Sequence, residues 1–333
     1  MSEKKNRSFW WLVVLLLVLT VAAAFLGLRY GSAQLRFSEV LAGLLRLDPQ
    51  SVYTKILWVV RLPHVAACLL AGAGLAVSGV LLQTAVNNPL AGPNIIGVNA
   101  GAGFAMVLGM CLAPMAYGLQ SVMAFAGAFL CTVLIVLTAN RAGGSRVTIL
   151  LAGVAISTLL SAGISLLKLL YPDVAIVYNY FSVGGVGGVT FQQLKLPAGI
   201  ILAVLVLSMV LANRLNLLCL GDSIAQTLGV RAKRVRFLAL LLASASAGAV
   251  VSFAGLLGFV GLMVPHMARK ITGSGDVRKL IPVSALLGAM LVVLADLLGR
   301  VLFAPSEIPA GIITAMIGAP FFFVLLLQRR NRL

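Results

Sequence analysis

Apolar residues in this chain run on for about 20 positions at a time, with polar residues confined to short breaks between the runs. A helix needs roughly 20 apolar residues to cross the hydrocarbon core of a bilayer, so each run predicts one membrane-spanning helix. The first run, Phe9–Leu28, is longer than the apolar part of a signal peptide, about 7–15 residues, and we expect it to be retained. From Leu62 to Asn140 there is no Asp, Glu, Lys or Arg and only one His, His64, which leaves room for three spans.

The pattern predicts an all-α polytopic membrane protein with one domain over residues 1–333. The ten expected helices are 9–28, 58–86, 93–112, 116–140, 147–170, 194–213, 235–253, 256–268, 281–302 and 308–328. Phe37–Leu45 predicts a short amphipathic helix on the outer membrane surface. Segment 174–190 contains four glycines, each of which weakens a helix by about 1 kcal/mol, and predicts an outer loop or re-entrant turn.

Composition excludes several classes of protein. Hydrophobic residues make up 61% of the chain and charged residues only 10%, against about 25% charged residues in soluble domains. This excludes a soluble enzyme, a disordered chain and a disulfide scaffold. The net charge of +17 would suggest nucleic acid in a soluble protein, but here the basic residues lie in short loops, which indicates membrane topology and no nucleic-acid partner.

The basic residues also predict the orientation. With the N-terminus inside, the inner segments contain 17 Lys and Arg and the outer segments only four, Arg29, Arg36, Arg46 and Lys55. Because basic residues accumulate in cytoplasmic loops, we expect both termini in the cytoplasm.

The chain lacks the motifs of an enzyme. It has no GxxxxGK[ST] phosphate loop, no HExxH and no GxSxG. The four cysteines, Cys68, Cys111, Cys131 and Cys219, are isolated, so we expect packing residues and no metal site. Asp296 and Arg300 are four residues apart and can pair on one helix face, either as part of an ion relay or as a pair near the outer helix end.

Two cytoplasmic segments have unusual local patterns. Residues 83–93 contain two prolines and a glycine that interrupt a helix, which is typical of a transport pathway but also of a tight inner loop. In the 214–234 loop, Ser223 and Gln226 fit a capping box and Gly229 a helix stop. A helix this short needs something to dock on, either a cytoplasmic partner or the lipid surface.

Several motifs together carry a family resemblance. They are Arg61-Leu-Pro, Ala73–Gln83, Asn88-Pro-Leu-Ala, Ile96-Gly-Val, Leu150-Leu-Ala-Gly-Val, Leu220-Gly-Asp, Gly258–Arg269, Leu294-Ala-Asp and Glu307-Ile-Pro-Ala-Gly-Ile. The chain resembles the membrane permease subunit of ATP-binding-cassette (ABC) importers for iron-siderophores, haem and cobalamin, over about residue 57 to the C-terminus.

The resemblance implies a type II importer permease in the bacterial cytoplasmic membrane. Such a permease pairs with a second copy or a close relative, binds two separate ATPase subunits and receives substrate from an extracytoplasmic binding protein. It is not an enzyme and holds no cofactor, because ATP and Mg²⁺ bind the partner ATPase. We expect a ferric siderophore as cargo, with haem or cobalamin as the alternative and an ion-coupled secondary transporter as a remote one.

The resemblance also assigns residues. The ATPase-docking residues are Leu220, Gly221, Asp222, Ser223, Ala225, Gln226, Leu228 and Gly229. The gate residues are Asn88, Pro89, Leu90, Gly144 and Ser145. The residues that dock the binding protein are Arg61, His64 and Arg300. The family has Arg where this chain has His64, which makes that contact sensitive to pH.

Overall fold

The computed structural model describes residues 2–31, 34–93, 97–114, 116–142, 145–302, 304 and 306–330, and every regular element among them is helical. In chain order the helices are α1 (Ser2–Arg29), α2 (Phe37–Leu44), α3 (Val52–Lys55), η1 (Ile56–Arg61), α4 (Leu62–Val86), α5 (Val98–Leu112), α6 (Tyr117–Arg141), α7 (Arg146–Leu170), α8 (Pro172–Val183), α9 (Phe191–Cys219), α10 (Asp222–Thr227), α11 (Ala232–Ala254), α12 (Val260–Thr272), α13 (Val277–Leu302) and α14 (Ala310–Arg330).

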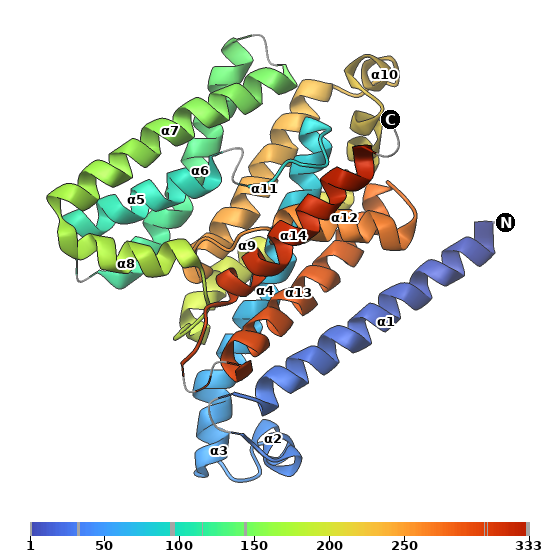
Figure 1. Ribbon diagram of the computed structural model, residues 1–333. Helices are drawn as coiled ribbons and strands as arrows, with labels where there is room; N and C mark the ends of the chain where they lie inside the picture. Colours follow the sequence, from blue (N-terminus) through green and yellow to red (C-terminus); the bar gives the residue numbers. More distant parts are fainter. Residues whose placement is uncertain are drawn as a thin grey trace.

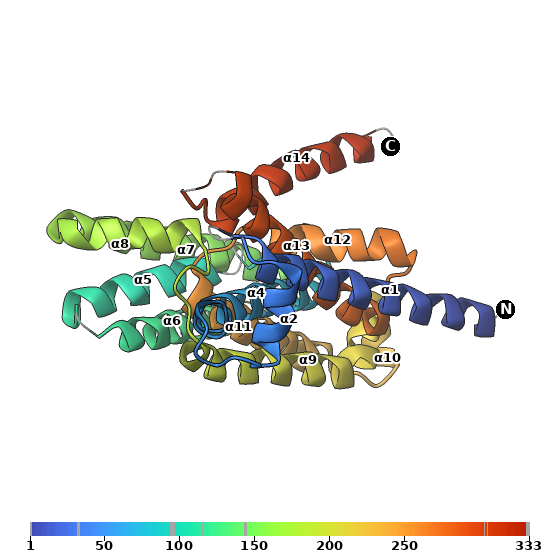
Figure 2. The same cartoon turned by 90° about the horizontal axis from the view of Figure 1, so that it is seen from below.

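Helix α4 forms the centre of the bundle and packs against α9, α11, α12 and α13 (Figures 1 and 2). Gly72 of α4 and Gly288 of α13 face each other so closely that a Cβ on either would collide with the opposite backbone. Small residues of this kind let membrane helices approach, because lipid provides no hydrophobic drive between them. Helices α5 to α8 form a second group on one side, while α1 and α14 lie at the periphery (Figure 2).

Seven helices among the described residues are long and apolar enough to cross a membrane, namely those within 8–29, 52–86, 118–139, 147–170, 191–219, 232–254 and 277–302. Of the other three expected spans, α5 and α12 are shorter helices, and the apolar part of α14 extends only over residues 310–325. Helix α12 has only 13 residues, because the chain turns at Phe259, whose φ is 63°, before it. The count of ten crossings therefore stays a prediction.

The interpretation of 174–190 as a loop is wrong over its first half, where α8 is a helix of 12 residues. Pro172 occupies the first helical position and Asp173 lies in the first turn, and both favour a helix start. The four glycines begin only at Gly184, whose φ of 75° ends the helix. The expected short helix at Phe37 is present as α2, and it packs through Val40 and Gly43 against η1.

Candidate functional site

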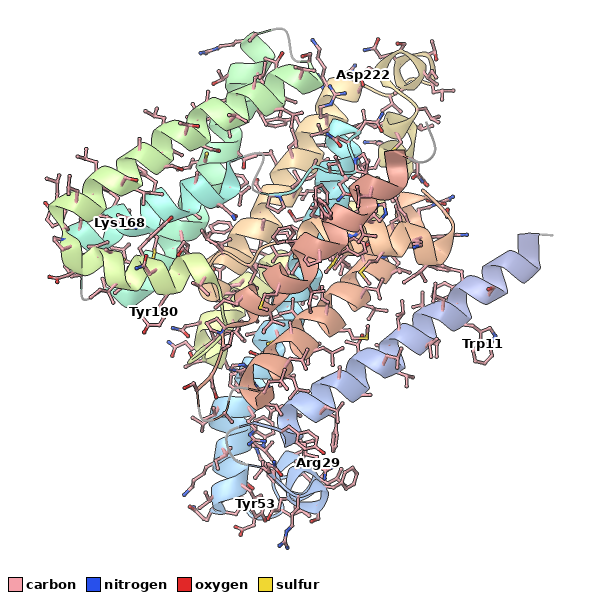
Figure 3. All side chains as sticks on the ribbon, viewed as in Figure 1. Trp11, Arg29, Tyr53, Lys168, Tyr180 and Asp222 are labelled. Carbon is pink, nitrogen blue, oxygen red and sulfur yellow. The ribbon has the colours of Figure 1, made fainter. Side chains whose placement is uncertain are left out.

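The predicted site residues lie at opposite ends of the bundle. Figure 3 shows Asp222, the first residue of α10, at one end of the bundle. Arg29 at the end of α1 and Tyr53 of α3 lie at the other end. We call these the α10 end and the α2 end.

At the α10 end, α10 begins at Asp222 and has six residues. The expected capping box is wrong: Gly221 is the residue before the helix, with φ 106°, and Ser223 lies exposed inside the helix. The positive φ, which glycine tolerates, turns the chain into the helix without a side-chain cap. The predicted stop is confirmed, because Gly229 follows the helix with φ 79°.

Exposed apolar side chains lie in α10 and directly on either side of it. Leu220, Ile224 and Leu228 are each at least half exposed, whereas Ala225 is fully buried against the protein. Ser223 and Gln226 are exposed on the same short helix. Exposed apolar side chains grouped on a helix this short are typical of an interaction site.

Arg236 of α11 connects α10 to α4. Its Nη2 donates to both carboxylate oxygens of Asp222, at 2.6 and 2.8 Å, and its Nε donates to the carbonyl oxygen of Ala85 at 3.0 Å. The Arg236 side chain is buried, and Ala85 lies in the last turn of α4, directly before the 87–93 segment. This linkage could not be predicted from the sequence, in which Arg236 is one of several basic residues in a cytoplasmic loop and indicates only the orientation of the chain.

The 87–93 segment begins with Asn87 in the left-handed conformation, with φ 52°. The Asn88 side-chain oxygen accepts a hydrogen bond from the Leu90 amide at 2.9 Å, an Asx-turn that holds the loop after α4. Asn88, Pro89 and Leu90 are half-buried. Leu90 and Pro93 line a pocket of about 260 Å³ together with Phe259, Leu262 and Phe322.

Gln83, one turn before this loop, ties it to α12. Its side-chain amide donates to the carbonyl oxygen of Leu262 at 3.2 Å, and its oxygen accepts from Arg269 at 2.6 Å. Both α11 and α12 therefore hold the end of α4 through polar side chains.

The second predicted gate element is only partly described. Ser145 begins α7 as its N-cap, where its hydroxyl accepts from the Thr148 amide at 3.0 Å. Gly144 lies outside the described residues.

At the α2 end, Arg61 and Arg300 are buried around the end of α1. Arg61 donates to the carbonyl oxygens of Leu28 and Arg29, at 2.5 and 2.7 Å, and Arg300 donates to those of Gly27 and Tyr30. The last carbonyls of a helix lack partners within the helix and carry partial negative charge. The two arginines therefore cap α1, a role that the sequence did not reveal.

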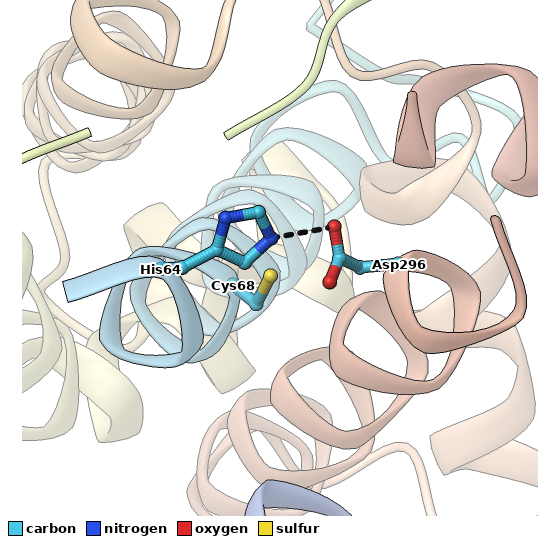
Figure 4. A group of neighbouring side chains, drawn as sticks. All are labelled: His64, Cys68 and Asp296. Atoms are coloured by element: carbon cyan, nitrogen blue, oxygen red, sulfur yellow. Dashed lines mark hydrogen bonds and ion pairs between the residues drawn. The ribbon is translucent and has the colours of Figure 1, made fainter. Parts of the chain in front are cut away.

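Asp296 and Arg300 form the predicted pair, with 2.8 Å between Nε and the carboxylate. Arg300 lies in the last turn of α13, so the pair is near a helix end as one of the two interpretations expected, and both side chains are buried in the protein. His64 Nε2 lies 2.9 Å from the other carboxylate oxygen of Asp296 (Figure 4). Arg61, His64 and Arg300 thus lie together, and their part in docking a binding protein stays a prediction.

Cys68 joins this group, since its sulfur and the ligand atoms of His64 and Asp296 all lie within 4.8 Å of one another. The view of the cysteines as isolated is wrong for Cys68. His64 and Cys68 are four residues apart on one helix face, a signal present in the sequence, but Asp296 is too distant in the chain for its position to be inferred.

Known proteins resemble this chain over nearly its full length. The model of the FecCD transport family matches residues 16–328. The chain belongs to the FecCD transport family. Two relatives are the Fe(3+)-citrate import system permease protein YfmE of Bacillus subtilis, 37% identical with 92% of each chain covered, and the hemin transport system permease protein HmuU of Yersinia pestis, 36% identical with 83% and 84% covered.

A solved structure has the same fold. It is described as an inward-facing conformation of a proposed metal-chelate type ABC transporter and matches with a TM-score of 0.85 at 31% identity, over 95% of this chain and 98% of the other. The expected family is thereby confirmed. As a FecCD protein the chain is a multi-pass permease of the bacterial cytoplasmic membrane, and permeases of ABC importers work in pairs with ATPase and binding-protein partners.

Proposed function

We propose that this FecCD permease is the translocation subunit of an ATP-driven importer that passes a ferric chelate, in first place a ferric siderophore, from a binding protein to the cytoplasm. The relative that imports Fe(3+)-citrate supports this cargo, while the hemin permease makes haem the second candidate. Two permease copies would enclose the pathway, and two ATPase subunits would bind ATP and Mg²⁺.

In this proposal the α10 end faces the cytoplasm and all ten expected spans cross the membrane. The distribution of basic residues supports this orientation, because the segments that it places in the cytoplasm contain 17 of the 25 Lys and Arg. The shorter helices α5, α12 and α14 would then cross with the help of their neighbours, since non-helical backbone is tolerated when it is buried in protein.

The observation that carries the proposal is the linkage of α10 through Arg236 to the end of α4. An ATPase subunit that binds Leu220, Ile224 and Leu228 would move α10, and the arginine would pass that movement to the loop after Ala85. Leu90 and Asn88 in that loop would form the inner gate, facing the second copy. Gly144 and Ser145 would contribute the other gate element.

At the α2 end we propose that the binding protein docks. Exposed Arg36, Arg46 and Lys55 would meet its acidic side chains first. Arg61, His64 and Arg300 lie behind them, and a carboxylate that reached Arg61 or Arg300 would replace a carbonyl contact by a stronger, charge-assisted bond.

The test replaces Ile224 and Leu228 together by Asp. We expect the ATPase subunit to be lost on purification of the permease, and uptake of labelled ferric siderophore by cells to fall to background, because carboxylates cannot enter an apolar interface. The matched control is Leu45→Asp with Leu47→Asp, two exposed leucines at the α2 end. Retention of the ATPase in the first variant, at the level of the control, would contradict the proposal.

A competition assay addresses the cargo. Unlabelled haem and cobalamin are each added in excess to wild-type cells that import the ferric siderophore. The cargo would be haem in place of the siderophore if excess haem suppresses uptake of the labelled ferric siderophore while other ferric siderophores leave that uptake unchanged.

A further inference from the structure

Side chains from two helices meet at the α2 end in a set that contains one nitrogen, one sulfur and one oxygen ligand. His64 and Cys68 lie on the same face of α4, and Asp296 reaches them from α13 (Figure 4). Among the described residues, this is the group of three or more His, Cys, Asp or Glu side chains close enough to share an ion.

We propose that His64, Cys68 and Asp296 form a binding site for a divalent metal ion of the zinc class. Zn²⁺ takes imidazole nitrogen, thiolate sulfur and carboxylate oxygen in tetrahedral sites, and three protein ligands leave a fourth position for water. Around one such ion, ligand atoms are roughly 3.3–3.8 Å apart, so the observed spread of up to 4.8 Å closes with a small rotation of the side chains.

The surroundings of Asp296 favour one oxygen for the ion. Arg300 Nε donates to Oδ2 at 2.8 Å, while Oδ1 faces His64 at 2.9 Å. Carboxylates that bind a metal are commonly held by a hydrogen bond on the other oxygen, which fixes their orientation. Arg300 therefore positions Asp296 and leaves Oδ1 directed at the site.

Charge and access agree with a divalent ion. The Asp296 carboxylate and a Cys68 thiolate together carry two negative charges, while Arg300, which also pairs with Asp296, directs its remaining donors to carbonyls at the end of α1. Cys68 and Asp296 are buried, whereas the His64 side chain keeps 12% of its surface exposed and provides the way in.

Binding exchanges protons and involves no oxidation or reduction. The Cys68 thiol releases its proton to solvent as sulfur bonds the ion. Neutral His64 shifts its proton from Nε2 to Nδ1, and protonated His64 releases one more to solvent. The ion replaces the hydrogen bond between His64 and Asp296 and joins α4 to α13. Because binding releases protons, the affinity for the metal ion rises with pH.

The test uses the purified, full-length permease in detergent, stripped of metal and free of iron chelates, with Co²⁺ as the probe. We expect one Co²⁺ per chain, with the near-ultraviolet absorption of a cobalt–thiolate bond, and displacement of Co²⁺ by Zn²⁺. Cys68→Ala should abolish the absorption and weaken Co²⁺ binding at least 100-fold, more than loss of an outer-shell partner, which costs about 10–100-fold. Cys131→Ala, another buried cysteine, is the matched control and should bind as wild type.

A second variant keeps the test decisive if Cys68→Ala does not fold. His64→Arg retains a donor beside Asp296 but removes a ligand, so it should fold and lose the same binding. Thiolate absorption that persists in either folded variant, or Co²⁺ binding by wild type no tighter than by the variants, would overturn the proposal and leave His64 as a hydrogen-bond partner of Asp296 only.

Discussion

Arg236 at the α10 end and Arg300 at the α2 end make the same kinds of contact. Each is a buried arginine that binds an aspartate and, with its remaining donors, carbonyl oxygens at the end of another helix. They differ in the aspartate. The Asp222 side chain is 42% exposed and lies on a helix of six residues, whereas that of Asp296 is 7% exposed and lies on one of 26.

The difference separates a movable contact from a fixed one. Helix α10 makes few contacts beyond α9 and α11, and in our proposal a partner that binds it would displace Asp222 and pull on Arg236. Asp296 belongs to α13, which packs along α4, and its arginine is enclosed by the end of α1. The same pair of residue types holds helices together at the α2 end, and we propose that it transmits movement at the α10 end.

The largest effect is expected for Arg300→Met. This change leaves the Asp296 carboxylate buried beside His64 alone, and removal of one partner from a buried ion pair costs about 3–5 kcal/mol. We expect a large loss of thermal stability of the purified permease, or failure to obtain it as a folded species.

The matched control is Arg278→Met on the same helix. Arg278 also pairs with an aspartate, Asp276, but its side chain is 59% exposed, and solvent-exposed ion pairs contribute little to stability. Equal melting temperatures of the two variants would show that burial does not distinguish the pairs.

A smaller effect is expected from Asp276 itself, in the loop before α13. Hydrogen bonds from Arg278 lower the pKa of this carboxyl from its usual value to about 2, with a further bond from Asn216. Because the pKa is lower in the folded protein, the charged carboxylate stabilises the fold above about pH 4, and this contribution is lost as the pH falls towards 2.

Asp276→Asn keeps a side-chain oxygen that can accept a hydrogen bond from a backbone amide at the start of α13, and it removes only the charge. We expect the variant to be less stable than wild type at pH 7 by about 1 kcal/mol at most, since its main partner Arg278 is exposed and solvent screens the pair. Thermal unfolding at pH 7 and pH 3 measures this. A difference that grows on acidification would contradict the sign of the pKa shift.

The sequence allowed an all-helical membrane fold and the family to be predicted, because apolar runs and ordered motifs are local features. It failed where local signals conflicted. The glycines of 184–188 hid α8, and Ser223 suggested a cap that Gly221 and Asp222 make unnecessary. Contacts between distant segments could not be predicted from the sequence, because spacing along the chain does not determine which helix faces pack together. The main examples are the contacts of Arg236 with Ala85 and of Asp296 with Cys68.

If Arg236 couples α10 to the loop after α4, then Arg236→Lys should break that coupling without removing the charge. A lysine keeps the charge and can bind Asp222, but its single nitrogen cannot also hold the Ala85 carbonyl in the present geometry. The measurement is ATP-driven uptake of ferric siderophore by proteoliposomes that contain the permease with its ATPase and binding protein. The account predicts that the ATPase still co-purifies and hydrolyses ATP while uptake falls at least about tenfold, the equivalent of one lost hydrogen bond of 1.4 kcal/mol. Uptake at the wild-type rate per ATP hydrolysed would contradict it.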